Sequence, residues 1–298
     1  MYPLFRRKIL RTIFRFITGI IKFVVCLIFI ICLIGAGMAA YAFYIAPDRL
    51  TTEDINVESS LVSRDIDVAV IADTHFGAGF EAEDFDKVID KINAEDVDIV
   101  LFLGDLIDDY NRYTIDNFSK GTGDPAVISE KLSEINASLG KFAVFGNHDY
   151  GGGAENHYED IMNAGGFTVL KNESYVLPST GLRLIGIDDL LLGYGSVAIS
   201  ESATSDMYDL IICHEPDIYD RLTGDNIDFM FAGHTHGGQI NIPYLRDEFL
   251  PSLGSKYLKG EYSDGISTLY VNPGLGTTKI KARLFAEPEI TYLHIKSI

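Results

Sequence analysis

The sequence predicts an α/β domain with β-sheets covered by helices, preceded by a single N-terminal transmembrane helix. Two observations predict the domain: short apolar runs alternate with amphipathic segments, and clusters of histidine and aspartate follow several of those runs. An uncharged run near the N-terminus predicts the membrane helix. With 298 residues, the chain holds this helix and one globular domain of roughly 250 residues.

Short apolar runs bounded by polar residues predict seven strands. They cover residues 68–72, 99–103, 142–145, 182–187, 210–213, 229–232 and 268–271. Between the first two runs, apolar residues from 85 to 92 recur at i, i+3, i+4 and i+7, which predicts a helix with one buried face. Similar spacing predicts a second helix over residues 128–139.

Residues 23–46 carry no charge, and as a helix they span about 36 Å, enough to cross a bilayer. The preceding residues 1–22 contain six basic and no acidic residues, so this segment is expected in the cytoplasm and the domain outside it. Residues 47–63 are polar and acidic without clear periodicity, which predicts a juxtamembrane linker. The catalytic domain is then expected over residues 64–298.

A cleaved export signal is the alternative to this single-pass anchor in the cell membrane. The basic run that begins Arg6-Arg7-Lys8 resembles a twin-arginine signal, and Ala40-Tyr41-Ala42 resembles a small-residue cleavage site. The apolar run is longer than the apolar core of an ordinary signal peptide, which favours an uncleaved anchor.

The charge of the chain argues against one class of partner. The formal net charge is -19, and without the six N-terminal basic residues 18 basic face 43 acidic residues, a balance of about -25. Because a surface of this sign repels polyanions, we expect no nucleic acid as a partner. Small phosphorylated substrates held by bound cations are compatible with it, and nothing in the sequence predicts an oligomeric state.

Polar motifs follow the predicted strands at the points where those strands end. They are Asp73-Thr74-His75, Gly104-Asp105, Gly146-Asn147-His148-Asp149, His214 and Gly233-His234-Thr235-His236. The carboxyl ends of strands in open α/β sheets gather ligand-binding loops, so the five motifs are expected to converge. Carboxylate and amide oxygens with imidazole nitrogens suit divalent Mn, Fe, Zn or Co. Cys213 precedes His214 and is expected to point to the opposite face, as core filler rather than as a thiolate ligand.

In this order the motifs resemble those of the calcineurin-like metallophosphoesterase family, from about residue 66 to the C-terminus. Gly237-Gly238-Gln239 and Asn272-Pro273-Gly274-Leu275-Gly276 are further similar to a bacterial membrane-associated branch with cell-wall phosphoesterases and UDP-diacylglucosamine pyrophosphatases. The resemblance implies a sandwich of two mixed β-sheets flanked by helices. It also implies hydrolysis of a phosphate ester or pyrophosphate bond, with a lipid-linked or envelope substrate favoured.

Carried over residue by residue, the resemblance implies two divalent metal ions. The first is held by Asp73, His75 and His236, the second by Asn147, His214 and His234, and Asp105 bridges them. A shared carboxylate is needed because two cations roughly 4 Å apart repel each other strongly. A hydroxide held between the two metals then attacks phosphorus.

The same resemblance leaves His148 without a metal, as the group that protonates or stabilises the leaving oxygen. Asp108 matches the family position that orients His148, and a solvated acidic loop is the alternative for it. Asp149 is expected to orient loop backbone. Asp109-Tyr110 replaces the Arg-Gly pair of protein Ser/Thr phosphatases, which argues against that activity.

Two other functions compete with this interpretation. The first is a membrane-bound metal-binding protein without turnover, against which the complete ligand set and His148 argue. The second is a nuclease or phosphodiesterase, and the acidic charge disfavours polynucleotides as its substrate. Arg283, near the C-terminus, is predicted either to contact substrate or to form a surface salt bridge.

Overall fold

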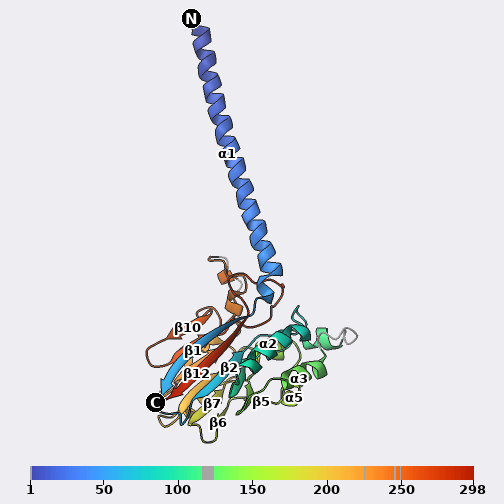
Figure 1. Cartoon of the computed structure of the whole chain (residues 1–298), viewed down its shortest axis with the longest axis vertical. Coiled ribbons are helices and arrows are strands. Elements are labelled where there is room, and N and C mark those ends of the chain that lie inside the picture. Colours follow the sequence, from blue (N-terminus) through green and yellow to red (C-terminus); the bar gives the residue numbers. More distant parts are fainter. Residues whose placement is uncertain (1, 116–123, 225, 245, 249) are drawn as a thin grey trace.

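In the computed structural model, a long N-terminal helix leads into a domain built around two β-sheets (Figure 1). The structure describes residues 2–115, 124–224, 226–244, 246–248 and 250–298. The α-helices are α1 (Tyr2–Tyr44), α2 (Ala82–Ala94), α3 (Pro125–Ser133), α4 (Asn147–Gly151) and α5 (Tyr158–Ala164). Short helical turns are η1 (Ala46–Asp48), η2 (Asn111–Ile115), η4 (Val197–Ser202), η5 (Pro216–Arg221), η6 (His236–Gly238) and η7 (Arg246–Glu248).

The first sheet has the strand order β1-β12-β2-β3-β4-β5. Its strands are β1 (Thr51–Ser59), β2 (Ile66–Ile71), β3 (Ile99–Phe102), β4 (Gly140–Ala143), β5 (Phe167–Val169) and β12 (Glu289–Ser297). β2 to β5 are parallel, whereas β12 pairs antiparallel with β2 and parallel with β1. This sheet is therefore mixed, as predicted.

The second sheet has the order β10-β11-β9-β8-β7-β6. Its strands are β6 (Glu173–Val176), β7 (Leu182–Gly186), β8 (Tyr208–Ile212), β9 (Phe229–Ala232), β10 (Gly260–Ser263) and β11 (Thr268–Val271). The four central strands are parallel, and β6 and β10 pair antiparallel at the two edges. All seven predicted strands are present, within a few residues of the expected bounds.

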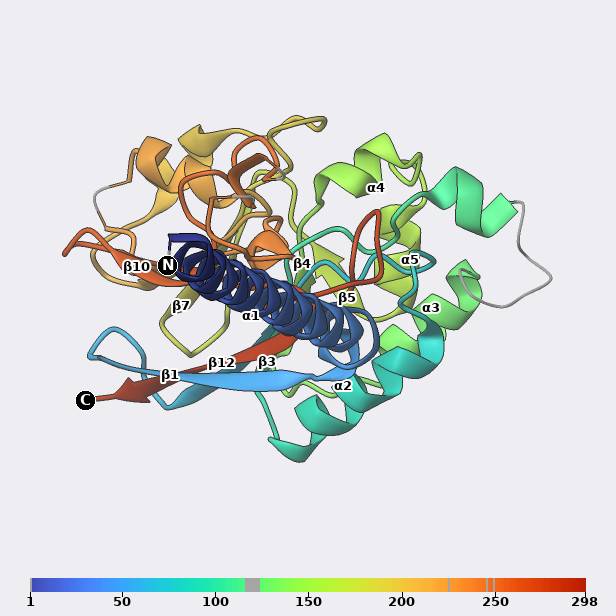
Figure 2. The same ribbon diagram turned by 90° about the horizontal axis from the view of Figure 1, so that it is seen from above.

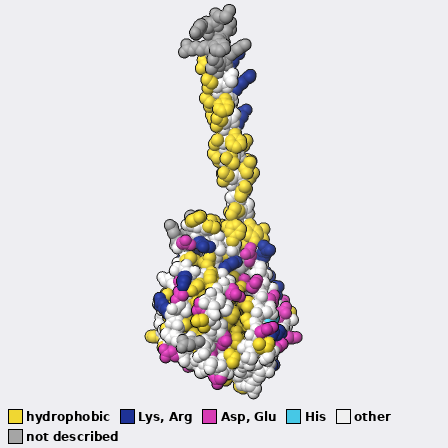
Figure 3. All heavy atoms as spheres, turned by 90° about the vertical axis from the view of Figure 1, so that its left-hand side faces the viewer, with side chains coloured by type: hydrophobic (Ala, Val, Ile, Leu, Met, Phe, Trp, Pro, Cys, Tyr) yellow, Lys and Arg dark blue, Asp and Glu magenta, His cyan; other side chains and the backbone are white. Residues whose placement is uncertain are grey.

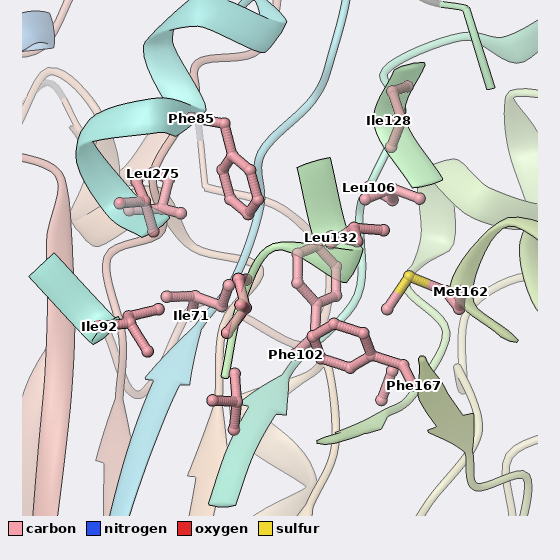
Figure 4. Close-up of a cluster of buried hydrophobic side chains, with 14 of the residues drawn as sticks. Ile71, Phe85, Ile92, Phe102, Leu106, Ile128, Leu132, Met162, Phe167 and Leu275 are labelled. Carbon is pink, nitrogen blue, oxygen red and sulfur yellow. The ribbon is translucent and has the colours of Figure 1, made fainter. Parts of the chain in front are cut away.

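The core forms in layers around these sheets. Val70 and Leu101 of the first sheet pack against Leu184 and Phe231 of the second in a buried cluster, so the two sheets form a sandwich. Helices α2, α3 and α5 cover the outer face of the first sheet, along one flank of the domain (Figure 2). Figure 4 shows Phe85 and Ile92 of α2 pointing toward Ile71 and Phe102 of that sheet.

The second predicted helix is shorter than expected. α3 ends at Ser133, although the apolar spacing extends to residue 139. Lys141 gives the reason, since its ammonium group donates to the carbonyls of Leu132 and Ile135 and satisfies the end of the helix. Beyond that point Leu139 packs on the inter-sheet core instead of on the helix face.

The sequence predicts an irregular linker over residues 47–63, and the structure contradicts this expectation. Residues 51–59 form β1, which pairs in register with β12 from Thr51 opposite Glu289 to Ser59 opposite Ser297. β1 lies at the sheet edge and buries only Ile55 fully, so its sequence lacks the apolar alternation that identifies most strands. The domain therefore begins almost directly after α1.

Within the part of the chain that the structure describes, one segment, Leu10–Asp48, is long and apolar enough to cross a membrane. Helix α1 carries this segment as far as Tyr44 and begins at Tyr2, so the basic residues are helical too and form no separate element before residue 23. Apolar side chains cover the helix and also gather where it meets the domain (Figure 3).

Candidate metal centre

The five motifs converge at the carboxyl ends of the strands. Asp73 and His75 follow β2, Asp105 follows β3, Asn147 opens α4 behind β4, His214 follows β8, and His234 and His236 follow β9. Five of these residues have positive φ, from 46° to 73°: Asp73, His75, Asp105, His234 and His236. Residues with a Cβ carry strain in that region, and such strain is concentrated at functional sites.

A first group comprises Asp73, His75 and His236, whose side chains are almost completely buried. Nε2 of His75 lies 3.0 Å from Nε2 of His236 and 3.9 Å from Oδ1 of Asp73. Nε2 of His236 lies 3.6 Å from the same oxygen of Asp73. Three potential ligand atoms therefore surround one point.

A second group comprises Asp105, His214 and His234, with one ligand atom of each within 4.8 Å of the others. Oδ2 of Asp105 lies 3.2 Å from Nε2 of His214 and 3.4 Å from Nε2 of His75. The Asp105 carboxylate thus lies between the two groups. Asp105 stays a prediction as the shared ligand, and this position is compatible with it.

The residues present fit divalent metal ions. Among the described residues, Oδ1 of Asn147 is buried without a hydrogen-bond partner. Buried polar atoms are almost always satisfied, so this orphaned amide oxygen indicates a place for a cation or water. Two carboxylates, an amide oxygen and four imidazoles form a donor set suited to Mn, Fe, Zn or Co.

Opposite charges lie close together in the site. Burial raises the pKa of Asp73. Burial also acts to raise the pKa of Asp105, but His214 and His75 outweigh it and hold that pKa well below its usual range. Burial acts to lower the pKa of His214, but Asp105 outweighs it and raises that pKa well above 6.5. The site therefore keeps an anionic carboxylate beside positive charge, which bound cations also supply.

Hydrogen bonds behind His214 and His234 determine which nitrogen of each imidazole faces the site. Nδ1 of His214 contacts the carbonyl of Leu103 at 2.7 Å, which leaves Nε2 toward the centre. Nε2 of His234 contacts the carbonyl of Ser252 at 2.9 Å, which leaves Nδ1 of this ring to face the site. Such second contacts orient metal ligands and raise their basicity.

Asp108 contacts two histidines in different ways. Its carboxylate Oδ1 lies 3.1 Å from Nδ1 of His75 and 3.5 Å from Nδ1 of His148. His148 Nδ1 instead makes a 2.7 Å hydrogen bond with the backbone carbonyl of Asp108. The side chain that the sequence assigns to His148 is therefore bonded mainly to His75. The imidazole of His148 is 30% exposed, so it borders the solvent side of the site.

Asp149 acts on backbone, as the sequence predicts. Its carboxylate accepts hydrogen bonds from the N–H groups of Gly146, Asp105 and Leu106, each at 2.9 or 3.0 Å. Burial, with the nearby charge of Asp105, raises the pKa of Asp149 to about 7. The contacts tie the loop after β4 to the loop after β3.

Arg283 contradicts both sequence-based interpretations, because it is fully buried rather than exposed at the substrate or in a surface ion pair. Its guanidinium donates to four backbone carbonyls, those of Pro273, Gly274, Gly276 and Ala286. Nη2 also lies 3.5 Å from Nδ1 of His236. Arg283 is thus a positioning residue, and only the neighbouring Asn-Pro-Gly-Leu-Gly motif hinted that a tight loop needed a partner.

The loop at residues 272–276 packs directly on the segment that carries Asp73. The N–H groups of Leu275 and Gly276 donate to the carbonyls of Ala72 and Asp73. A Cβ on Gly276 would lie 1.9 Å from the Thr74 carbonyl oxygen, and one on Gly274 would lie 2.6 Å from the Asp73 Cβ. Glycine is required at both positions, because a Cβ would meet the Thr74 backbone at position 276 and the Asp73 side chain at position 274.

A two-sheet sandwich with buried carboxylates and imidazoles at its strand ends defines the class of metal-dependent phosphoesterases. The chain belongs to the calcineurin-like phosphoesterase family, whose model matches residues 66–238. The family prediction from the sequence is therefore confirmed, and the protein is a phosphoesterase hydrolase of a family that uses divalent metals.

Two bacterial relatives support this assignment. The chain is 35% identical over 272 residues to the metallophosphoesterase YkuE of Bacillus subtilis, an alignment that covers 89% of this chain and 92% of YkuE. It is 30% identical over 174 residues to the phosphodiesterase YaeI of Escherichia coli, covering 57% and 63% of the two chains. A dimetal phosphatase from Danio rerio aligns with 70% of this chain and 88% of its own, at 12% identity and a TM-score of 0.46.

Proposed function

We propose that the protein is a membrane-anchored phosphoesterase that uses two divalent metal ions to hydrolyse a phosphate ester or pyrophosphate bond outside the cytoplasm. The observation that carries the proposal is the position of the Asp105 carboxylate, within 3.4 Å of His75 and 3.2 Å of His214. When bound, two divalent cations supply Lewis acidity toward the phosphoryl oxygens and acidify the attacking water.

The residues of the chain hold the metals and donate a proton to the leaving group. Asp73, His75 and His236 form one half of the cradle, and Asn147, His214 and His234 form the other. His148 is held at 2.7 Å by the Asp108 carbonyl, and its backbone N–H donates to Asp105. Because its ring borders solvent, His148 reaches the leaving oxygen of a bound ester and donates a proton to it.

Substrate class follows from charge and from one relative. An acidic domain disfavours polynucleotides, whereas a small or lipid-linked phosphate is drawn to the cations in the site. The relative named as a phosphodiesterase supports a diester. The second candidate function, metal binding without turnover, has in its favour the burial of most of the ligands.

Activity and metal content together test the proposal. Full-length protein in detergent is loaded with Mn, Fe, Zn or Co and assayed on p-nitrophenyl phosphate, bis-p-nitrophenyl phosphate and a pyrophosphate ester. Asp105→Asn abolishes turnover and lowers metal content. His148→Ala lowers turnover about 100-fold with metal retained, and His157→Ala, at an exposed histidine outside the motifs, changes neither.

Two results would contradict the proposal. Protein that binds two metals yet hydrolyses none of the three substrates favours the binding protein. Equal metal loss in Asp105→Asn and His148→Ala shows that His148 is a ligand. Orientation is tested separately by protease access to the domain in intact cells, and the mass of the mature chain decides between anchor and cleaved signal.

A further inference from the structure

We propose that the metal site opens toward the membrane that α1 enters, and that residues 277–285 contact the lipid headgroups there. The substrate is then an amphiphile whose phosphate ester lies in the headgroup layer of that same membrane. This inference rests on the proposed function, because it requires α1 to be an uncleaved anchor.

Strand directions place the site at the anchored end of the domain. β12 begins at Glu289, two residues after Glu287, whose carboxylate accepts a hydrogen bond from Tyr41 of α1. β2 is antiparallel to β12, with Val70 opposite Thr291 and Ile66 opposite Ile295, so its carboxyl end returns to the α1 end. β3 and β4 run parallel to β2 and carry Asp105 and Asn147 to that same end. Figure 1 shows α1 leaving the domain there.

The domain is attached close to the membrane. Ala42 and Ala46 of the apolar run are buried against the domain, and the N–H of Arg283 donates to the Ala42 carbonyl at 2.9 Å. β1 then begins at Thr51. The uncharged run is about 36 Å long as a helix, against a hydrocarbon core of about 30 Å, so its last turn already reaches the headgroup layer. The α1 end of the domain therefore lies at the membrane surface.

The surface at this end suits a lipid interface. Ile280 and Phe285 are 51% and 53% exposed, and Tyr44 at the end of α1 is 80% exposed. Exposed Lys279 and Lys281 flank Ile280 in a chain of strongly negative net charge. Apolar side chains between lysines match the interfacial layer, where the apolar group inserts and the ammonium groups meet lipid phosphates.

The same loop touches the site. Oγ1 of Thr278 lies 3.4 Å from Oδ1 of Asp108, which bonds His75. The side chain of Gln239 fixes the loop, because it donates to the carbonyls of Thr278 and Ile280 and accepts from the Thr278 N–H. The exposed tip at Ile280 is thus two residues from a direct contact with the site, so a headgroup phosphate need not leave the bilayer.

A matched pair of substrates tests this proposal. Full-length protein in phosphatidylcholine vesicles, with and without phosphatidylglycerol, hydrolyses either hexadecyl p-nitrophenyl phosphate in the bilayer or soluble bis-p-nitrophenyl phosphate. The double variant Ile280→Asp with Phe285→Asp lowers the rate on the vesicle-borne ester about tenfold and leaves the soluble rate unchanged. The control Ile266→Asp, at an exposed residue before β11 and so at the opposite end of its sheet, changes neither rate.

A location measurement separates failure of this inference from failure of the proposed function. In a Cys26→Ser, Cys32→Ser background, an environment-sensitive fluorophore is attached at Ile280→Cys or at Ile266→Cys. A blue shift and quenching by lipid-borne quenchers at position 280 only supports the inference, whether or not either ester is hydrolysed. Equal, water-like emission at both positions overturns it, as does an equal loss of both rates in the double variant.

Discussion

Nη2 of Arg283 lies 3.5 Å from Nδ1 of His236, on the side of the imidazole away from His75. Burial lowers the pKa of His236 well below 6.5, and the charges of His75 and Arg283 lower it further. A histidine that ligates metal must be neutral, and burial, more than this contact, keeps His236 neutral. The backbone N–H of Arg283 also donates to the Ala42 carbonyl of α1, so one residue contacts both α1 and His236.

The first prediction concerns this residue. Arg283→Met leaves four buried carbonyls without their donor, and we expect the free energy of unfolding to fall by about 3 kcal/mol or more. Metal content falls with it, because the loop behind Asp73 and the position of His236 are released. Arg283→Lys retains the positive charge but not the planar guanidinium group, so we expect it to lose less stability and less metal than Arg283→Met. Thermal denaturation and elemental analysis measure both effects. Arg49→Met, at an exposed arginine, is the control, and equal stability of Arg283→Met and wild type would disprove the positioning role.

Gly274 provides the second prediction, through a comparison with Gly265. Both have positive φ, 70° and 88°, but a Cβ on Gly265 meets open space while one on Gly274 meets Asp73. Gly265→Ala costs about 1 kcal/mol for backbone strain alone. We expect Gly274→Ala to cost clearly more and to lower metal affinity, because Asp73 is displaced. Metal titration of both variants checks this, and equal behaviour would mean that the loop gives way without moving Asp73.

The extent to which the sequence predicts this molecule depends on the kind of signal. Asp73, Asp105 and His214 follow buried parallel strands, which are visible as apolar runs, so their convergence could be foreseen. Strand β1 could not be foreseen, since an edge strand with one solvent-exposed face has a polar sequence. The burial of Arg283 was equally hidden, because its partners are backbone carbonyls, which carry no residue identity. The division of the Asp108 contacts between His75 and His148 depends on side-chain geometry of a few tenths of an ångström.

His294 of β12 gives a pH prediction away from the site. Its ring contacts Asp67 on β2 at 2.7 Å and Asp54 on β1 at 3.2 Å. Burial acts to lower the pKa of His294, but these two carboxylates outweigh it and raise the pKa. Because the folded pKa exceeds the unfolded value of about 6.5, the stabilisation is full below that pH and is lost as pH rises through the folded pKa.

Removing His294 should therefore remove this pH dependence. We expect His294→Asn to be less stable than wild type at low pH, by under about 1 kcal/mol since Asp54 is exposed, and to match it more closely at alkaline pH. Melting temperatures of both proteins across this range measure the effect, with His157→Asn as the control. A constant difference between His294→Asn and wild type at every pH would show that the ion pairs contribute nothing.

The last prediction separates the two contacts of Asp108. Asp108→Asn weakens the hydrogen bond between residue 108 and Nδ1 of His75. Loss of a hydrogen bond that orients a metal-binding histidine lowers metal affinity about 10- to 100-fold. His148 keeps its hydrogen bond, because the acceptor is the backbone carbonyl of residue 108, which a side-chain substitution leaves in place. We therefore expect metal titration to shift while kcat at saturating metal stays within about threefold of wild type, an energy difference under 1 kcal/mol. Unchanged metal affinity with a large fall in kcat would instead assign the carboxylate to His148, as the sequence alone predicts.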